Sequence, residues 1–275
     1  WGVGLIGKYF ELINGCAFKP SDWKARGLPI VRIQNLNDNL APFNYTDRNI
    51  DKKYRLEPGD LVFAWSGTTG TSFGARIWKG PAGVLNQHIF RVVPNTDFLD
   101  IIFSFFILKQ IQVLIEAKAH GFKSSFLHVK KADLVKIPFP IPPLAEQQAI
   151  ATALSDMDAL IAAQEKLIAK KRDIKTATMQ QLLTGYKRLP GFNQPWHEKC
   201  FGELAQLDPE NLGVGTPREY RFKYISLESV DTGRLVSHAE VAFGSAPSRA
   251  RRVMRHGDVL MSTVRPLLRS HLFFQ

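Results

Sequence analysis

Cysteine is nearly missing from this sequence: Cys16 and Cys200 are the only two among 275 residues. Two cysteines so far apart do not form a disulfide scaffold of the kind that staples small secreted domains, and they lack the spacing of zinc ligands. We therefore expect a protein of the reducing cytoplasm that holds no metal ion.

Long apolar runs are missing too. The most apolar run, Phe98–Leu108, is interrupted by Asp100 and Ser104 and is much shorter than the roughly 20 residues that cross a bilayer. No signal peptide opens the sequence, so we expect no membrane partner. Because the first residue is Trp1 rather than Met, we expect a piece of a longer product.

Catalytic motifs are absent as well. No Asn/Asp-Pro-Pro-aromatic tetrapeptide is present to hold a flipped adenine, as an adenine methyltransferase requires. The glycine-rich stretch Gly67–Gly74 lacks the Gly-Lys-Ser/Thr ending of a phosphate loop, so it predicts a loop or strand turn. Glu57 and Asp60 have no further carboxylate nearby to complete a nuclease metal site. We expect no catalytic residue and no cofactor.

What the sequence has is positive charge. Its 36 Lys and Arg exceed its 25 Asp and Glu, which gives a net charge of +11. Residues 1–140 hold 18 basic and 11 acidic side chains, a net +7. Excess positive charge favours a polyanion through counterion release, and nucleic acid is the usual one. A merely basic, soluble surface is the alternative on charge alone.

Three segments recur in the same order, at offsets of 195 residues for the Trp and 198 for a Gly-Asp pair. The first copies are Trp1–Gly7, Pro29–Leu36 and Leu56–Phe63, and their counterparts are Trp196–Gly202, Phe222–Val230 and Met254–Met261. The recurrence predicts a duplicated domain whose second copy is shorter than the first.

The first copy has the pattern of a mixed α+β domain. Short β-rich runs bounded by Gly, Pro and Asn predict strands at Ile30–Ile33, Leu61–Trp65 and Ile89–Val93. The segment Phe98–Ala117 predicts a helix with a buried face that ends near Gly121.

A long helix is predicted between the copies. Four prolines between Pro138 and Pro143 favour an extended approach to it, and Leu144–Leu183 then contains neither Gly nor Pro. A helix of this length extends about 60 Å and needs a second helix to cover its apolar stripe. Gly185 is expected to end it. The packing residues that we expect are Leu144, Leu154, Ile161, Leu167, Ile168 and Ile174. A basic stretch, Lys166–Lys175, is expected to be its solvated face.

These segments resemble one known family. The run Ile137–Ile150, which contains Pro-Pro-Leu-Ala-Glu-Gln-Gln, precedes the long helix and Leu182-Leu-Thr-Gly185, and the whole is similar to the central region of type I restriction–modification specificity subunits. The Gly-Asp turns in Pro58–Gly67 and Gly257–Pro266 resemble that family, and Leu85–Arg91 is similar to a segment of its target-recognition domains.

The resemblance implies a non-catalytic subunit that reads a split double-stranded DNA target. It implies a target-recognition domain at 1–140, a spacer helix with its proline-rich approach at 141–187, and a partial second recognition domain at 188–275. Modification (methyltransferase) subunits dock on such spacers, and a restriction subunit joins them. The second domain is shorter than the family pattern, which puts a complete two-part reader in doubt.

For DNA contact we look to polar, basic and aromatic residues in predicted loops, because such groups read base edges and hold phosphates. The candidates in the first copy are Lys19, Trp23, Ser66, Thr68, Thr69, Arg76, His120, Lys123 and Ser124. The candidates in the second copy are Arg249, Arg251, Arg252, Arg255 and Arg265.

Three alternatives stay open at this stage. The chain could dimerise through Leu144–Leu183, which would give a two-fold symmetric, interrupted target. It could be an assembly or inhibitory fragment that binds partners through the helix without reading DNA. It could also be a fragment of a methyltransferase– or nuclease–specificity fusion.

Overall fold

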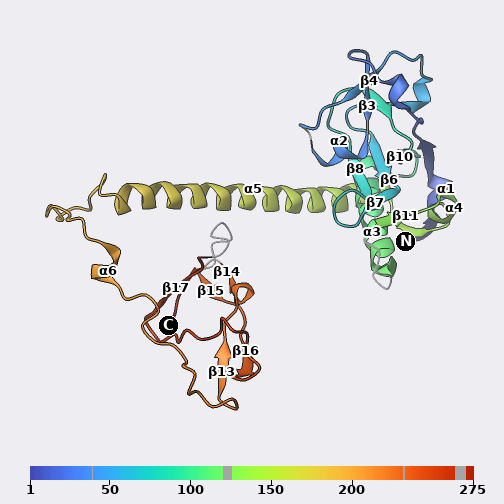
Figure 1. Cartoon of the computed structure of the whole chain (residues 1–275). Helices are drawn as coiled ribbons and strands as arrows, with labels where there is room; N and C mark the ends of the chain where they lie inside the picture. Colours follow the sequence, from blue (N-terminus) through green and yellow to red (C-terminus); the bar gives the residue numbers. More distant parts are fainter. Residues whose placement is uncertain (39, 120–125, 232, 264–270) are drawn as a thin grey trace. The chain divides into compact units, whose positions relative to one another are not determined.

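The computed structural model describes residues 1–38, 40–119, 126–231, 233–263 and 271–275. The chain divides into two compact units, Trp1–Thr178 and Met179–Gln275. The N-terminal unit combines two four-stranded sheets, two short strand pairs, several helical turns, the helix α3 and most of the long helix α5 (Figure 1). The mixed α+β class expected from the sequence is therefore confirmed.

Two four-stranded sheets form the centre of the N-terminal unit. One is wholly antiparallel, with the order β2 (Phe10–Asn14), β10 (Ile89–Pro94), β6 (Leu61–Ala64) and β8 (Gly74–Ile77). The other has the order β4 (Asn44–Thr46), β3 (Leu28–Val31), β9 (Gly83–Leu85) and β5 (Arg55–Leu56), and only its β3–β9 pair is parallel.

Smaller elements complete this unit. Two short antiparallel pairs join β1 (Gly2–Leu5) to β12 (Pro138–Ile141) and β7 (Ser66–Thr68) to β11 (Phe126–His128). The helix α3 (Ile101–Ala119) packs on β8 and β6. The short helical turns are α1 (Ile6–Tyr9), η1 (Pro20–Asp22), α2 (Ile33–Asn37), η2 (Lys52–Tyr54) and α4 (Lys131–Leu134).

The strand β6 explains why its sequence is a continuous apolar run. Leu61 and Phe63 point into the core beneath α3, whereas Val62 and Ala64 point into a second core shared with β3, β5 and β9. All four side chains are at most 2% exposed. Successive side chains of a strand alternate between its faces, so a strand that is covered on both faces must be apolar throughout. Full burial of one large apolar side chain stabilises the fold by roughly 1.5–3 kcal/mol.

The predicted strands and the first helix are present, with shifted ends. The strand expected at Ile30–Ile33 ends at Val31, because Ile33 begins α2. There the side chain of Asn35 accepts a hydrogen bond from the backbone N–H of Arg32 at 3.1 Å and stabilises the turn. The helix expected from Phe98 begins at Ile101, since the carboxylate of Asp100 caps it by accepting the N–H of Phe103 at 2.8 Å.

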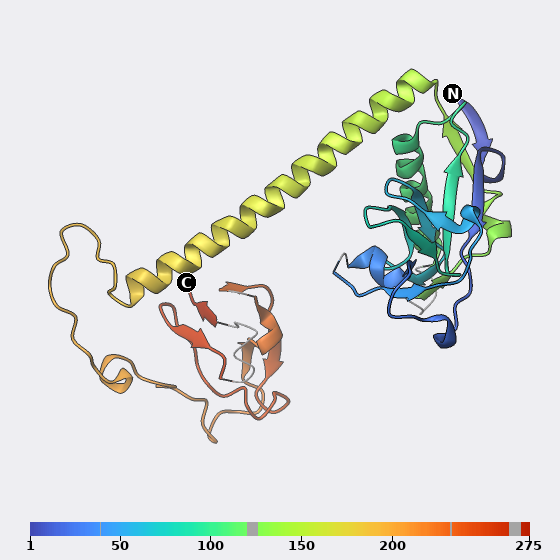
Figure 2. The same cartoon turned by 90° about the horizontal axis from the view of Figure 1, so that it is seen from above.

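The long helix α5 (Leu144–Leu183) has the predicted bounds (Figures 1 and 2). It begins directly after Pro143. Gly185, with φ of +72°, follows its end, and the N–H of Lys187 bonds back to the carbonyl of Gln181 at 3.0 Å. This is the pattern of a glycine-terminated helix.

After the end of α5, the described residues of the C-terminal unit form short elements. Three antiparallel pairs join β13 (Arg221–Tyr224) to β16 (Ala239–Ala242), β14 (Val230–Asp231) to β15 (Arg234–Leu235), and β17 (Val259–Met261) to β18 (His271–Phe273). The helical turns are α6 (Phe201–Leu204) and η3 (Leu227–Ser229).

The internal repeat has a structural counterpart at the two Gly-Asp turns. Gly59 and Gly257 have φ of +95° and +93°. In each turn the Asp carboxylate accepts the backbone N–H three residues earlier, at 2.8 Å for Asp60 and 2.7 Å for Asp258. Each turn then leads into the first strand of an antiparallel pair, β6–β8 or β17–β18. The recurring residues therefore build the same local structure twice.

We expect Gly257→Ala to lower the local stability of this second turn by about 1 kcal/mol, because a side chain disfavours left-handed φ. No atom lies within 4 Å of the added Cβ, so the cost is one of backbone conformation alone. Hydrogen exchange of the peptide 255–261, read by mass spectrometry, measures it. The matched control is Gly213→Ala, where the Cβ is equally unobstructed and φ is not positive. Equal protection in the two variants would contradict the expectation.

Candidate nucleic-acid interface

Lys19 and Trp23 lie at the two ends of η1, on the surface of the N-terminal unit. Lys19 is exposed and Trp23 is 40% exposed. The guanidinium of Arg32 lies 5.6 Å from the centre of the Trp23 ring. An exposed aromatic ring with a cation over it offers both a stacking surface and a positive charge, and DNA binds to such groups.

The glycine-rich stretch folds as a strand turn between β7 and β8, as the sequence predicts. The carbonyl of Thr68 accepts three backbone N–H groups, from Thr71, Ser72 and Phe73, at 3.0–3.3 Å. Thr68 and Thr69 are half-buried. Ser66 is only 6% exposed, and its hydroxyl is therefore poorly placed to reach DNA.

Arg76 stabilises this turn through hydrogen bonds to its backbone. Its guanidinium donates to the carbonyl oxygens of Ala75 and Thr71, both at 2.8 Å. Burial lowers the pKa of Arg76, and the charge of Glu116 partly offsets that effect. Arg76 thus uses two of its N–H donors for hydrogen bonds to backbone carbonyls, and these bonds stabilise the turn.

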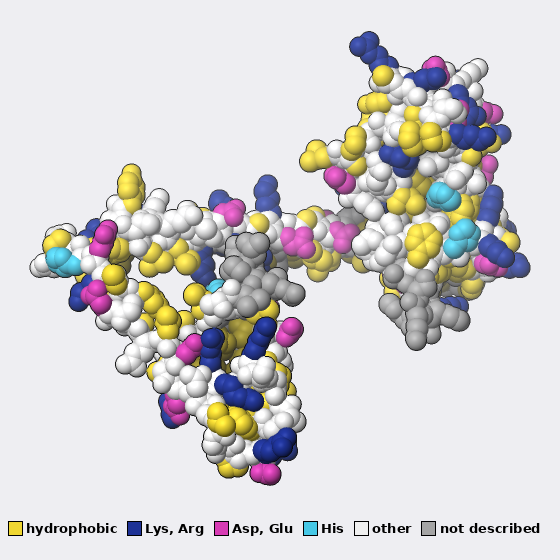
Figure 3. Space-filling model, viewed as in Figure 1, with side chains coloured by type: hydrophobic (Ala, Val, Ile, Leu, Met, Phe, Trp, Pro, Cys, Tyr) yellow, Lys and Arg dark blue, Asp and Glu magenta, His cyan; other side chains and the backbone are white. Residues whose placement is uncertain are grey.

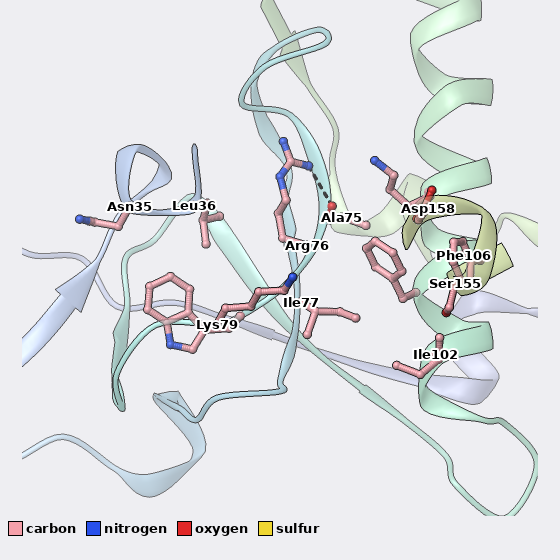
Figure 4. Close-up of a pocket in the computed structure, with 13 residues that line it drawn as sticks. Asn35, Leu36, Ala75, Arg76, Ile77, Lys79, Ile102, Phe106, Ser155 and Asp158 are labelled. Carbon is pink, nitrogen blue, oxygen red and sulfur yellow. Dashed lines mark hydrogen bonds between the residues drawn. The ribbon is translucent and has the colours of Figure 1, made fainter. Parts of the chain in front are cut away.

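Arg76 of β8 also lines a cavity of about 410 Å³, whose wall includes residues of α3 and α5 (Figure 4). Lys79 and Lys109 add positive charge to its wall, and Ser155 and Asp158 of α5 form the opposite side. Asp158 is the one carboxylate among its lining residues.

The arginines of the C-terminal unit are partly neutralised by carboxylates. Arg252 pairs with Asp208 at 2.8 Å, and Arg255 pairs with Glu210 at 2.6 Å. The guanidinium of Arg251 lies over the Phe243 ring, 4.0 Å from its centre.

Within the described residues, the exposed side chain of Arg249 has no hydrogen bond or ion pair. The pairs of Arg252 and Arg255 are exposed, and such pairs stabilise little. A phosphate could therefore replace the carboxylates.

Four of the predicted contact residues lie outside the described residues: His120, Lys123, Ser124 and Arg265.

The apolar stripe of α5 is exposed. The side chains that the sequence predicts to pack are between 40% and 53% exposed: Leu144, Leu154, Ile161, Leu167, Ile168 and Ile174. Leu154 and Ile150 also border an apolar cavity of about 350 Å³ against α3. A row of exposed apolar side chains on one helix is typical of a surface that a partner covers.

A buried glutamine, Gln147, attaches the first turn of α5 to the domain. It was not among the predicted site residues. Gln147 is 0% exposed, and its Oε1 accepts the N–H of Asp100 at 2.9 Å. Its Nε2 donates to the carbonyls of Phe98 and Pro142 at 2.9 and 2.8 Å. The Glu-Gln-Gln sequence was the available signal, because the first of these glutamines lies seven residues before Leu154 and so falls on the apolar face of the helix.

The described residues contain neither a cluster of metal-binding side chains nor a helix that could span a membrane. No group of three or more His, Cys, Asp or Glu side chains there could hold a metal ion. No helix in that part of the chain is long and apolar enough to cross a membrane.

Comparison with known proteins gives consistent matches. A family model described as the type I restriction modification DNA specificity domain matches residues 1–170. The type I restriction enzyme MjaVIII specificity subunit of Methanocaldococcus jannaschii is 28% identical over 188 residues, which cover 67% of this chain and 42% of that protein. The EcoBI specificity subunit of Escherichia coli is 28% identical over 182 residues, or 64% of this chain and 37% of that protein.

Among solved structures, the HsdS subunit from Thermoanaerobacter tengcongensis aligns with a TM-score of 0.49 at 18% identity. The alignment covers 66% of this chain and 44% of that one. The chain spans less than half the length of the curated relatives described above.

Proposed function

The chain belongs to the family of type I restriction modification DNA specificity domains, and from this we propose that it selects the DNA sequence on which a restriction–modification complex acts. Its curated relatives are named specificity subunits, so the chain is a non-catalytic recognition component. The modification subunits that it would direct carry the methyltransferase, and a restriction subunit would complete the complex.

The exposed stripe of α5 is the observation that carries the proposal for how the complex is built. A helix with a half-exposed apolar row along most of its length is stable in water only with a partner over that row. In this proposal the stripe is the spacer on which recognition domains are held apart and modification subunits dock.

The charges along α5 favour a second copy of the chain, in antiparallel orientation, as one partner. From Leu144 to Glu165 every charged residue is acidic, whereas the five basic residues all lie between Lys166 and Lys175, where Asp173 is the only acid. Antiparallel pairing brings the acidic half of each helix against the basic half of the other. Parallel pairing would place like charges together. Two recognition domains would then face two DNA half-sites, and the target would be split and symmetric.

The recognition domains would contact DNA through basic, aromatic and hydroxyl groups that are exposed or partly exposed. In the N-terminal unit these are Lys19, Trp23, Thr68 and Thr69, with Arg76 behind the turn. In the C-terminal unit they are Arg249, Arg251, Arg252 and Arg255. The residues outside the described ranges, His120, Lys123, Ser124 and Arg265, stay part of the proposal. Ser66 is left out because it is buried.

Methylation sequencing of host DNA tests this function. The chain is co-expressed with its cognate modification subunit, and each is also expressed alone. We expect one split, adenine-methylated motif that disappears when the chain is omitted. A symmetric motif supports pairing through α5. No motif, despite co-purification of the two proteins, would refute DNA recognition and favour an assembly or inhibitory role.

A further inference from the structure

Four segments that are distant in sequence meet at one end of the antiparallel sheet of the N-terminal unit. Asn14 ends β2 and pairs with Phe90 in β10. The N–H of Trp65, just after β6, bonds to the carbonyl of His88 at 3.2 Å, and the carbonyl of Trp65 accepts the N–H of Val129 at 2.9 Å. The ends of β2, β6 and β11 and the start of β10 therefore lie side by side.

Trp65 is the centre of a cluster of polar rings and amides. The His128 ring meets it edge-on with the centres 4.8 Å apart, and the His88 ring lies 5.3 Å away. Phe90 packs beside it, at 5.8 Å, and connects the cluster to the core. The Trp65 Nε1–H donates to Oδ1 of Asn14 at 3.1 Å. Trp65 is half-buried, whereas Asn14 and His128 are exposed.

The hydrogen bond from Trp65 orients the Asn14 amide. Because an indole N–H can only donate, the bonded atom must be the amide oxygen, and the amino group of Asn14 is turned away from the ring. Within the described residues, neither the Nδ2 of Asn14 nor the His128 ring has a hydrogen-bond partner. Asn14 thus offers two N–H donors and the second lone pair of its oxygen. The side-chain amide of Gln87, 3.2 Å from Nε2 of His88, adds a further polar group.

The backbone holds this cluster in one place. The chain after Asn14 passes so close to the β9–β10 turn that a Cβ on Gly15 would overlap the carbonyl oxygen of Asn86. Cys16 then pairs with Asn86 in an isolated bridge, and its N–H bonds to the carbonyl of Leu85 at 2.8 Å. Such fixed polar groups suit the recognition of base edges, which depends on geometry.

Cations flank the cluster. Arg48 and Lys53 lie near enough to Cys16, two residues after Asn14, for their charges to lower the pKa of its thiol against the larger, opposite effect of burial. Arg48 pairs with Asp22 at 3.5 Å and donates to the carbonyl of Ala17 at 3.3 Å, and Lys53 pairs with Asp51 at 3.7 Å. Lys130 is exposed two residues after His128. Figure 3 shows histidine side chains together on this unit with Lys and Arg side chains around them.

We propose that this surface, which we define as Asn14, Gln87, His88 and His128 around Trp65, contacts base edges of double-stranded DNA, with Arg48, Lys53 and Lys130 on the adjoining phosphates. The inference rests on the proposed function and assigns its base-reading groups. Asn14 carries the donor and acceptor pair that matches an adenine edge in the major groove, and Trp65 is a positioning residue that orients it.

The variant Asn14→Asp tests base recognition and is expected to leave the fold intact. Aspartate keeps the oxygen that accepts the Trp65 N–H, so thermal unfolding is expected to be unchanged. It removes both amide donors and places a negative charge toward DNA. The control is Asn37→Asp, the same change at another exposed asparagine, in α2. The variants His128→Ala and Gln87→Ala test the other groups.

The full chain and each variant are co-expressed with the modification subunit, and host DNA methylation is sequenced. Purified complexes are then titrated with a duplex carrying the wild-type motif. We expect Asn14→Asp to weaken binding at least tenfold, in line with the loss of one bidentate base contact, and to relax or change one base of the motif. We expect Asn37→Asp to leave both unchanged.

The outcomes are distinguishable. An unchanged motif and affinity in Asn14→Asp, His128→Ala and Gln87→Ala would overturn the inference and leave the proposed function intact. Absence of any motif with the wild-type chain would overturn both.

Discussion

The Ile161→Asp variant is expected to sediment as a monomer and to lose the split methylation motif. Ile161 is 53% exposed and lies near the middle of α5, so two antiparallel copies would bring their Ile161 side chains close together. Full burial of an Ile contributes roughly 1.5–3 kcal/mol, pairing removes only its exposed half from water, and the change occurs in both chains. The lost burial alone should therefore weaken the dimer by about 1.5–3 kcal/mol, or roughly 10- to 150-fold, and the charge placed in the interface adds to this.

Ala162→Asp is the matched control for that variant. It introduces the same charge about 100° around the helix, away from the apolar stripe. Sedimentation velocity of the chain, alone and with the modification subunit, measures the effect. A wild-type chain that is a monomer under both conditions would contradict pairing through α5.

A charge reversal tests whether the two α5 helices pair in antiparallel or parallel orientation. The double variant Asp156→Lys, Asp158→Lys places cations against the basic segment Lys166–Lys175 of an antiparallel partner, and should weaken the dimer. In a parallel pair it would only replace one like-charge contact with another. The effect should shrink in high salt, because these side chains are exposed.

The second large effect is expected at the root of the helix, where Gln147→Leu should destabilise the N-terminal unit. The leucine leaves the partly buried N–H of Asp100 and the carbonyls of Phe98 and Pro142 without their partner. An unsatisfied group costs roughly 1–3 kcal/mol when it is fully buried and less when water reaches it, so we expect a loss of about 2–3 kcal/mol. Urea denaturation followed by tryptophan fluorescence measures it.

Gln148→Leu is the control, because the neighbouring side chain is exposed. It should change the free energy of unfolding by less than about 0.5 kcal/mol. Equal midpoints for the two variants would show that the three hydrogen bonds of Gln147 are not needed. Gln147→Glu should be as harmful as leucine, since a carboxylate cannot donate to the two carbonyls and its charge would be buried.

The Gln147 hydrogen bonds also have a consequence for recognition. They join α5 to the segment that precedes α3, and thereby fix the direction in which the helix leaves the domain. If α5 sets the gap between two half-sites, the Gln147→Leu variant should methylate motifs with more variable spacing before methylation is lost.

The bounds of α5 could be predicted from the sequence because its stop signals are local. Pro143 precludes a helix before it, and Gly185 adopts the left-handed conformation that ends one. The Gly-Asp turns were equally predictable, since a positive φ at glycine and a carboxylate bonded three residues back involve only neighbouring residues. The absence of catalytic motifs and the likeness to specificity subunits could also be recognised from the amino-acid sequence alone.

Tertiary structure decided which polar residues lie together. Asn14, Trp65, His88 and His128 share no period and no motif, and they meet only because antiparallel pairing aligns the ends of four strands. Likewise, long-range contacts occupied Arg76 with backbone carbonyls and buried Ser66, although both looked available in sequence. Local conformation follows from neighbours along the chain, whereas exposure and convergence of side chains depend on which strands pair. That pairing is settled by the packing of the whole domain.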